Sequence, residues 1–238
     1  MSKHRDIVYI IFNSARNEFI YHGIEFKHFI LSIKEPVPNI LLLKHNFSGD
    51  DYQPNLKLTY VKSEDMGQLM DDNIYQYGDF SWLDFKELPS LEILTPIEIA
   101  EILYFGHMGK PIDSPFNSKL KNRFAYYSHD DGWFNKIYCR NVNEFTNVLS
   151  NYIAFRLSEI AGININPLED IISNEILKWA ETGILIDFRM MEKNSFKIPL
   201  YRIGKHYDID ELCNNLDSYV NSTNFITLQY LSDYWMLR

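Results

Sequence analysis

The sequence of 238 residues contains few of the features that would mark a specialised class of protein. Its two cysteines are too few for a disulfide framework and favour a reducing compartment. No stretch approaches the roughly 20 apolar residues of a membrane span, and the apolar run from Ile7 to Phe12 is too short for a signal peptide. The net charge of −9 argues against non-specific binding to nucleic acid, which depends on neutralising phosphates. We therefore expect a cytoplasmic protein that binds neither membranes nor nucleic acid.

Motifs with a fixed chemistry are also missing. The seven histidines include no His-x-x-x-His pair of the zinc-protease type or other paired metal spacing. The segment Gly106-His-Met-Gly109 lacks the preceding strand that a phosphate-binding glycine loop requires. Cys139 and Cys213 fall on apolar faces of a predicted strand and a predicted helix, which disfavours a cysteine nucleophile. The sequence therefore predicts no cofactor and more readily a binding protein than an enzyme.

The composition is that of a globular protein with a core rich in aromatic rings. Hydrophobic residues make up 46% of the chain and charged residues 23%, with 16 Tyr and 16 Phe. Strand-like runs at 7–12, 19–33, 39–47 and 56–61 predict a mostly β region, and 64–94 has poor periodicity typical of a loop. We expect a β-rich region over 1–93 and an α+β region over 94–238, which could also form one continuous domain.

A helix is clearly signalled after residue 94. Thr95 is suited to the N-cap, Pro96 to the first helical position, and Glu98 completes a capping box three residues after the threonine. Apolar residues follow on nearly every side of this helix, which predicts that it is buried on most sides. Gly106 is expected to end it.

A β-hairpin is expected from Arg123 to Arg140 around an Asp131-Gly132 turn, because Asp-Gly between alternating apolar residues favours a two-residue turn. This turn pairs His129 with Phe134 and Tyr127 with Lys136. One face of the hairpin is then a core face that carries Phe124, Tyr126, Trp133, Ile137 and Cys139.

The order of helix, hairpin and helix occurs twice, over 95–161 and over 167–220. The second hairpin is expected from strands 184–191 and 196–203, with Pro199 at an edge or a bulge because proline cannot donate to a ladder. The predicted fold class is therefore α+β, with an N-terminal mostly β region followed by two successive helix–β-hairpin–helix units.

Negative charge is concentrated between residues 50 and 101, which hold twelve acids and three bases. Aromatic side chains lie among the acids, and at an interface aromatics act as anchors while carboxylates steer and align a basic partner. The alternative is a solvated loop whose aromatics dock into the core. The predicted acidic-aromatic surface consists of Asp71, Asp72, Tyr75, Tyr77, Asp79, Phe80, Trp82 and Asp84.

The second face of the first hairpin is basic and aromatic, with Tyr127, His129, Lys136 and Arg140 as its predicted binding residues. Such a face could stack on and pair with an anion. Equally, its charges could pair inside the protein with the acidic segment before it.

Two functions of different classes follow. The first is a protein-binding module, of an inhibitor, immunity or anti-defence type, that captures a partner with a basic surface. The second is a metal-dependent hydrolase or nucleotide-binding protein with a pocket around His107 and the hairpin tip His129-Asp130-Asp131. In the plainer alternative to that pocket, the two aspartates only form the turn and His107 lies at a helix end.

Overall fold

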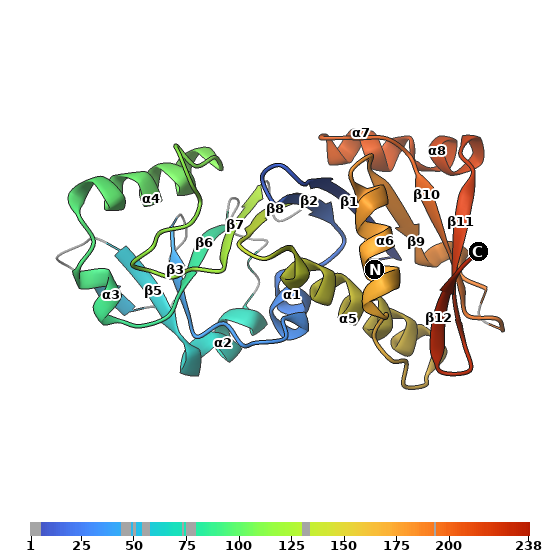
Figure 1. Ribbon diagram of the computed structural model, residues 1–238, viewed down its shortest axis with the longest axis horizontal. Helices are drawn as coiled ribbons and strands as arrows, with labels where there is room; N and C mark the ends of the chain where they lie inside the picture. The colour runs from blue at the N-terminus through green and yellow to red at the C-terminus, as the bar shows by residue number, and fades with distance from the viewer. Residues whose placement is uncertain are drawn as a thin grey trace. The chain divides into compact units, whose positions relative to one another are not determined.

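The computed structural model describes residues 6–43, 49, 51–53, 58–72, 74, 80–129, 134–192 and 194–238. The chain divides into two compact units (Figure 1). Unit 1 comprises Met1–Ala15, Phe19–Lys34 and Asn143–Arg238, and unit 2 comprises Arg16–Glu18 and Glu35–Val142. None of the helices in the described part of the chain is long and apolar enough to cross a membrane.

Unit 1 contains the strand order β12-β11-β10-β9-β1-β2, and the pairings from β12 to β1 are antiparallel. Its interior is rich in rings, with Phe19 stacked on Phe145 at 3.8 Å between ring centroids. Its elements are β1 Ile7–Asn13, β2 Glu18–His22, α1 Phe26–Ser32, α5 Val142–Ala161, α6 Asp170–Ala180, β9 Ile184–Asp187, a 3-10 helix Phe188–Met190, β10 Lys197–Arg202, α7 Ile209–Asn214, α8 Leu216–Ser222, β11 Phe225–Leu231 and β12 Tyr234–Leu237.

Unit 2 contains the strand order β8-β7-β6-β3-β5-β4, and all of these pairings are antiparallel. Its elements are β3 Asn39–Leu42, β4 Asp51–Gln53, β5 Leu58–Lys62, a 3-10 helix Ser63–Asp65, α2 Met66–Asp71, β6 Phe80–Phe85, α3 Pro89–Glu92, α4 Pro96–Met108, β7 Phe124–His129 and β8 Phe134–Cys139.

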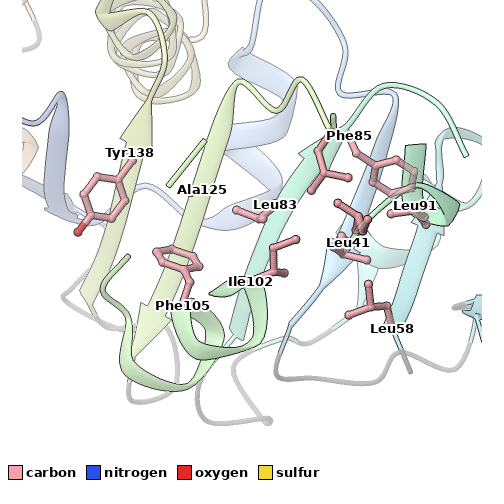
Figure 2. Close-up of a cluster of buried hydrophobic side chains, with 11 residues drawn as sticks. Leu41, Leu58, Leu83, Phe85, Leu91, Ile102, Phe105, Ala125 and Tyr138 are labelled. Carbon is pink, nitrogen blue, oxygen red and sulfur yellow. The ribbon is translucent and has the colours of Figure 1, made fainter. Parts of the chain in front are cut away.

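A hydrophobic cluster joins α3 and α4 to one face of the sheet in unit 2. Figure 2 shows Ile102 and Phe105 of α4 beside the strands that carry Leu83 and Ala125. Tyr138 of β8 belongs to the same cluster, with its ring 6.1 Å from that of Phe105. The inner side of α4 is therefore part of the core of unit 2.

The first hairpin has the register expected from the sequence. His129 pairs with Phe134, Ser128 with Asn135 and Tyr127 with Lys136. The turn itself, at 130–133, lies outside the described residues. Both faces of the hairpin are buried at its base, because Phe124 and Tyr126 are covered on one face and Ala125 and Tyr138 on the other.

The mixed α+β class is confirmed, but the expected layout of two helix–hairpin–helix units is not. The second hairpin does not stand alone, because β9 pairs with β1 from the N-terminal region and β10 pairs with β11. The position between residues 93 and 94, expected to separate two regions, lies inside unit 2.

Several elements differ from the sequence-based expectation. The run expected as a further strand near residue 26 is helix α1, which buries Phe26 and Phe29 at helical spacing. Strand β6 lies in the segment 64–94, which was expected to be a loop. All six residues of this strand are buried, so its sequence lacks the polar–apolar alternation that would have indicated a strand. The helix expected at the end of the unit 167–220 is divided into α7 and α8, and strand β12 was not expected.

Pro199 lies in the interior strand β10, so its predicted edge position is wrong. Its partner Thr227 exchanges backbone hydrogen bonds of 2.8 and 2.9 Å with Arg238, so Pro199 needs no donor toward β11. On the other side, the first residue of β10 that pairs with β9 is Leu200, so Pro199 lies just before that pairing. The missing N–H of the proline therefore falls where neither neighbouring strand requires it.

Candidate functional site

The predicted acidic-aromatic surface is only partly accessible. Phe80, Trp82 and Asp84 are buried in β6, an interior strand between β3 and β7, so the prediction that they contact a partner is wrong for these three. Asp71 is exposed at the end of α2 and Asp72 is half-buried. Tyr75, Tyr77 and Asp79 lie outside the described residues. A role of these remaining residues in binding stays a prediction.

Asp84 holds the start of β7 in place. One of its carboxylate oxygens, Oδ1, accepts hydrogen bonds from the backbone N–H groups of Arg123, at 2.8 Å, and Phe124, at 2.7 Å. Burial raises the pKa of Asp84 to about 6, against the opposing effect of these two hydrogen bonds and the Arg123 guanidinium. This carboxylate therefore has a role inside the fold.

The basic side chains of the first hairpin are engaged within unit 2. Arg123 donates to the carbonyl oxygens of Glu35 and Pro36, at 2.7 and 3.1 Å. Arg140 donates to the Asn122 carbonyl at 2.9 Å. These contacts engage both guanidinium groups inside the unit, and an anion-binding role of this face stays a prediction.

The other predicted residues of this face are also partly covered. Lys136 is half-buried and lies 3.8 Å from the buried Glu18 carboxylate, and burial lowers its pKa. Tyr127 is half-buried against Gly109, where a Cβ would meet its ring at 3.0 Å. Tyr138, two residues after Lys136 in β8, is buried in the core, and burial raises the pKa of its hydroxyl. His129 ends β7, but its side chain lies outside the description.

The proposed metal or nucleotide pocket at the hairpin tip is not tested, because Asp130 and Asp131 lie outside the described residues. His107 is exposed in the last turn of α4. Within the described ranges, no group of three or more His, Cys, Asp or Glu side chains could hold a metal ion.

Helix α4 exposes an apolar surface that sequence reasoning missed. The helix begins as predicted, since Thr95 Oγ1 accepts from the Glu98 N–H and the Glu98 carboxylate accepts from the Thr95 N–H at 2.7 Å. It was expected to be buried on most sides, but only Ile102, Phe105 and Gly106 are buried. The α4 apolar face, as we call it, consists of the exposed side chains Ile97, Tyr104 and Met108, and Leu103 is exposed on a flank of the same helix.

Two exposed isoleucines extend this surface beyond the helix. Ile93 precedes α4 and is 59% exposed, and Ile112 follows it in the loop and is 57% exposed. The signal in the sequence was the helix itself: a helix that lies on a sheet can bury only one side, so apolar residues on all sides imply an exposed apolar surface.

Gly106 lies inside α4, and the predicted helix end at this residue is wrong. A Cβ at Gly106 would lie 2.6 Å from the Cβ of Leu43, so glycine is required for the helix to approach the chain beneath it. The helix ends two residues later at Met108, and its C-cap Gly109 has a φ of 61° and donates its N–H to the Phe105 carbonyl.

A hollow with a volume of about 120 Å³ adjoins α4 and the loop that follows it. Its apolar wall includes Leu83 of β6 and Ile102 and Phe105 of α4. The remaining lining residues are Glu98, Glu101, Pro111, Ile112, Asp113, Ser114, Pro115, Phe116 and Asn117.

The carboxylates of the hollow have different surroundings. Lys119 lies 2.6 Å from the Glu98 carboxylate and, with Thr95, lowers the pKa of Glu98 to about 2. For Glu101 and Asp113, no hydrogen bond or ion pair joins the carboxylate to any residue in the described part of the chain. The hollow therefore combines an apolar wall with two carboxylates that lack a bound cation.

Comparison of the chain with protein-family models, with curated proteins and with solved structures gave no match. The function must therefore be argued from the site alone.

Proposed function

We propose that the chain is a protein-binding module that docks a partner with a basic surface on the α4 apolar face. The observation that carries the proposal is the exposure of large apolar side chains on one side of a regular, well-capped helix. Ile97 is 72% exposed and Met108 is 49% exposed, and the two lie eleven residues apart on the same side of α4. Contiguous exposed apolar patches of this kind mark interaction sites in soluble proteins.

Burial of this face would supply binding energy. Complete burial of one exposed aliphatic side chain contributes about 1.5–3 kcal/mol. Several such side chains on a preformed helix need little ordering on association, which lowers the entropic cost of binding. The face is therefore suited to act as the apolar centre of an interface.

The charge around the face favours a basic partner. Residues 87–117 contain five carboxylates, from Glu87, Glu92, Glu98, Glu101 and Asp113, and one lysine, Lys110; of the five, Glu98 is paired with Lys119. A second copy of the same chain would bring two such acidic rims together, and like charges across an interface are unfavourable. The acids of the segment 50–101, including Asp71 and Asp72, would add long-range attraction for a cationic partner.

A module of this kind acts by occupying a surface of its partner, as an inhibitor, immunity or anti-defence protein does. A cytoplasmic location is supported by the two cysteines, Cys139 and Cys213, which are both free thiols. Because unit 1 carries no comparable apolar helix face in its α6, we assign binding to unit 2.

The proposal is tested with two matched variants, Ile97→Lys on α4 and Ile171→Lys on α6. Ile171 is the control because it is 82% exposed on a helix of unit 1. Each purified protein is immobilised, incubated with extract of the native cell and analysed by mass spectrometry. We expect a protein that is retained by the wild type and by Ile171→Lys but lost with Ile97→Lys.

Association rates of that retained protein complete the test. Steering by carboxylates predicts that its association slows as salt increases, while its dissociation changes less. Retention that is equal on all three proteins would refute the proposal, and so would dimerisation of the wild type that Ile97→Lys abolishes.

A further inference from the structure

The size of the hollow beside α4 limits what it can bind. Its volume of about 120 Å³ is close to that of an engineered apolar cavity of about 150 Å³ that binds benzene. Sites for drug-sized ligands and cofactors have volumes of roughly 300–1,000 Å³. The hollow can therefore accept one side chain but is too small for a nucleotide.

The chemistry of the wall selects the kind of side chain. Ile102, Phe105 and Phe116 offer apolar contact for an aliphatic stem. Glu101 and Asp113 offer negative charge at the same hollow, and no basic residue lines it. Two cations adjoin lining residues and are already engaged: Lys119 Nζ lies 2.6 Å from the Glu98 carboxylate, and the Arg140 guanidinium lies over the Phe116 ring at 4.9 Å.

The other polar groups of the lining are engaged and keep the loop in shape. Ser114 Oγ accepts from the Phe116 N–H at 3.1 Å, and Asn117 Oδ1 accepts from the Lys119 N–H at 2.8 Å. The Asn117 N–H donates to Asn122 Oδ1 at 2.8 Å. Such a network holds the hollow open in the absence of a ligand, so binding does not require the loop to reorganise.

Glu101 connects the hollow to the α4 apolar face. It is four residues after Ile97 and three before Tyr104, positions that are neighbours on a helix surface. A partner that covers Ile97 and Tyr104 therefore passes directly over Glu101 and the mouth of the hollow.

We infer that the hollow is a binding site for a single lysine or arginine side chain of the partner. The methylene stem packs against Ile102, Phe105 and Phe116, and the cationic head pairs with Glu101 and Asp113. This inference rests on the proposed function, since the side chain belongs to the partner that covers the α4 apolar face. It explains why the two carboxylates remain without a cation inside the chain.

The site can be tested without knowledge of the partner. The full chain, labelled with ¹⁵N, is titrated with N-acetyl-arginine methylamide, N-acetyl-lysine methylamide and the uncharged N-acetyl-norleucine methylamide, and amide shifts are followed by NMR. We expect both cationic probes to shift amides of Glu101, Ile102, Asp113 and Phe116, and norleucine to bind more weakly. In a Glu101→Gln/Asp113→Asn double variant, the dissociation constant of the arginine probe should rise about fivefold or more.

A matched variant, Glu92→Gln, removes an exposed carboxylate outside the hollow and should leave the affinity of the probes unchanged. The inference is overturned if norleucine binds as well as the cations, if the double variant binds arginine like the wild type, or if no amide shifts. Ile97→Gln separates the two proposals, because it removes an apolar side chain from the α4 apolar face without placing a cation beside Glu101. It should reduce capture of the partner and retain binding of the arginine probe. If the wild type does not bind the cationic probes but the variant at Ile97 still loses the partner, the side-chain site is refuted and the proposed function is not.

Discussion

Helices α4 and α6 have similar lengths, 13 and 11 residues, but they distribute their apolar residues differently. In α6 the buried side is formed by Ser173, Ile176, Leu177 and Ala180, and Ile171 is its only large exposed apolar residue. In α4 the buried side contains Ile102 and Phe105, while four large apolar residues face outward. Packing within unit 1 therefore explains the apolar residues of α6 other than Ile171. Packing within unit 2 explains Ile102 and Phe105 of α4 but not the four exposed apolar residues of that helix.

The two units also differ in how they hold a buried aspartate. In β9 of unit 1, Arg189 binds both carboxylate oxygens of Asp187, at 2.9 and 2.6 Å. In β6 of unit 2, Asp84 instead accepts two backbone N–H groups, and the Arg123 Nε lies 3.7 Å away. Asp187 therefore has a close bidentate guanidinium as its partner, whereas Asp84 is held mainly by backbone N–H groups.

The largest expected effect separates the two sides of α4. Phe105→Ala removes a buried ring from the cluster with Leu83 and Tyr138 and should lower the free energy of unfolding by about 3–5 kcal/mol. Its neighbour Tyr104 faces outward, so Tyr104→Ala should cost less than about 1 kcal/mol. Urea denaturation, monitored by circular dichroism, measures the free energy of unfolding of both variants. Equal losses of this free energy would show that α4 does not have a buried side and an exposed side.

A second prediction uses the buried carboxylate of unit 2. The pKa of Asp84 is raised in the folded state from 3.8 to about 6, so folding is favoured by protonation. Its contribution to stability is complete below pH 3.8 and is lost as the pH rises through 6. At about 1.4 kcal/mol for each pKa unit, the loss is about 3 kcal/mol.

The measurement compares the wild type with Asp84→Asn, which cannot ionise. The stability of the wild type relative to this variant should fall as the pH is raised from 4 to 7, as determined by urea denaturation at each pH. Asp71→Asn serves as the control, because it removes a carboxylate that is exposed at the end of α2. A flat difference for Asp84→Asn would show that burial does not dominate its titration.

A smaller effect is expected where α4 approaches Leu43. Alanine normally stabilises a helix by about 1 kcal/mol relative to glycine, but at Gly106 a Cβ would lie 2.6 Å from that of Leu43. Gly106→Ala should therefore destabilise the protein by about 1–3 kcal/mol, the usual cost of overpacking. Gly67 of α2 has nothing within 4 Å of the added Cβ, so Gly67→Ala should be neutral or stabilising. Thermal denaturation of both variants and the wild type measures these effects.

The sequence predicted those features that depend on neighbouring residues. The capping box of Thr95 and Glu98 and the register of the first hairpin both depend on contacts a few residues apart, and both are confirmed. The helix end at Gly106 was wrong because that glycine serves a contact with Leu43, which is 63 positions away and invisible to a local pattern.

The candidate site was harder to predict for the same reason. Phe80, Trp82 and Asp84 have the composition of an interface, yet pairing of β6 with β3 and β7 buries them. Conversely, the apolar residues of α4 have the composition of a core, and only the one-sided contact with the sheet leaves Ile97 and Met108 exposed. Composition alone could not separate a core from a binding surface, because both use the same side chains.

The smallest effect is expected for Ile97→Lys, and it is the sharpest test of the contrast between α4 and α6. If Ile97 does not serve the fold, its replacement should change the free energy of unfolding by no more than about 0.5 kcal/mol, as for other exposed positions. Ile171→Lys should do the same on α6. Only Ile97→Lys should also reduce aggregation on heating, because it interrupts an apolar surface, whereas Ile171 is the only large exposed apolar residue of α6. A loss above about 1 kcal/mol for Ile97→Lys would place this residue in the core of the protein and remove the α4 apolar face as a binding surface.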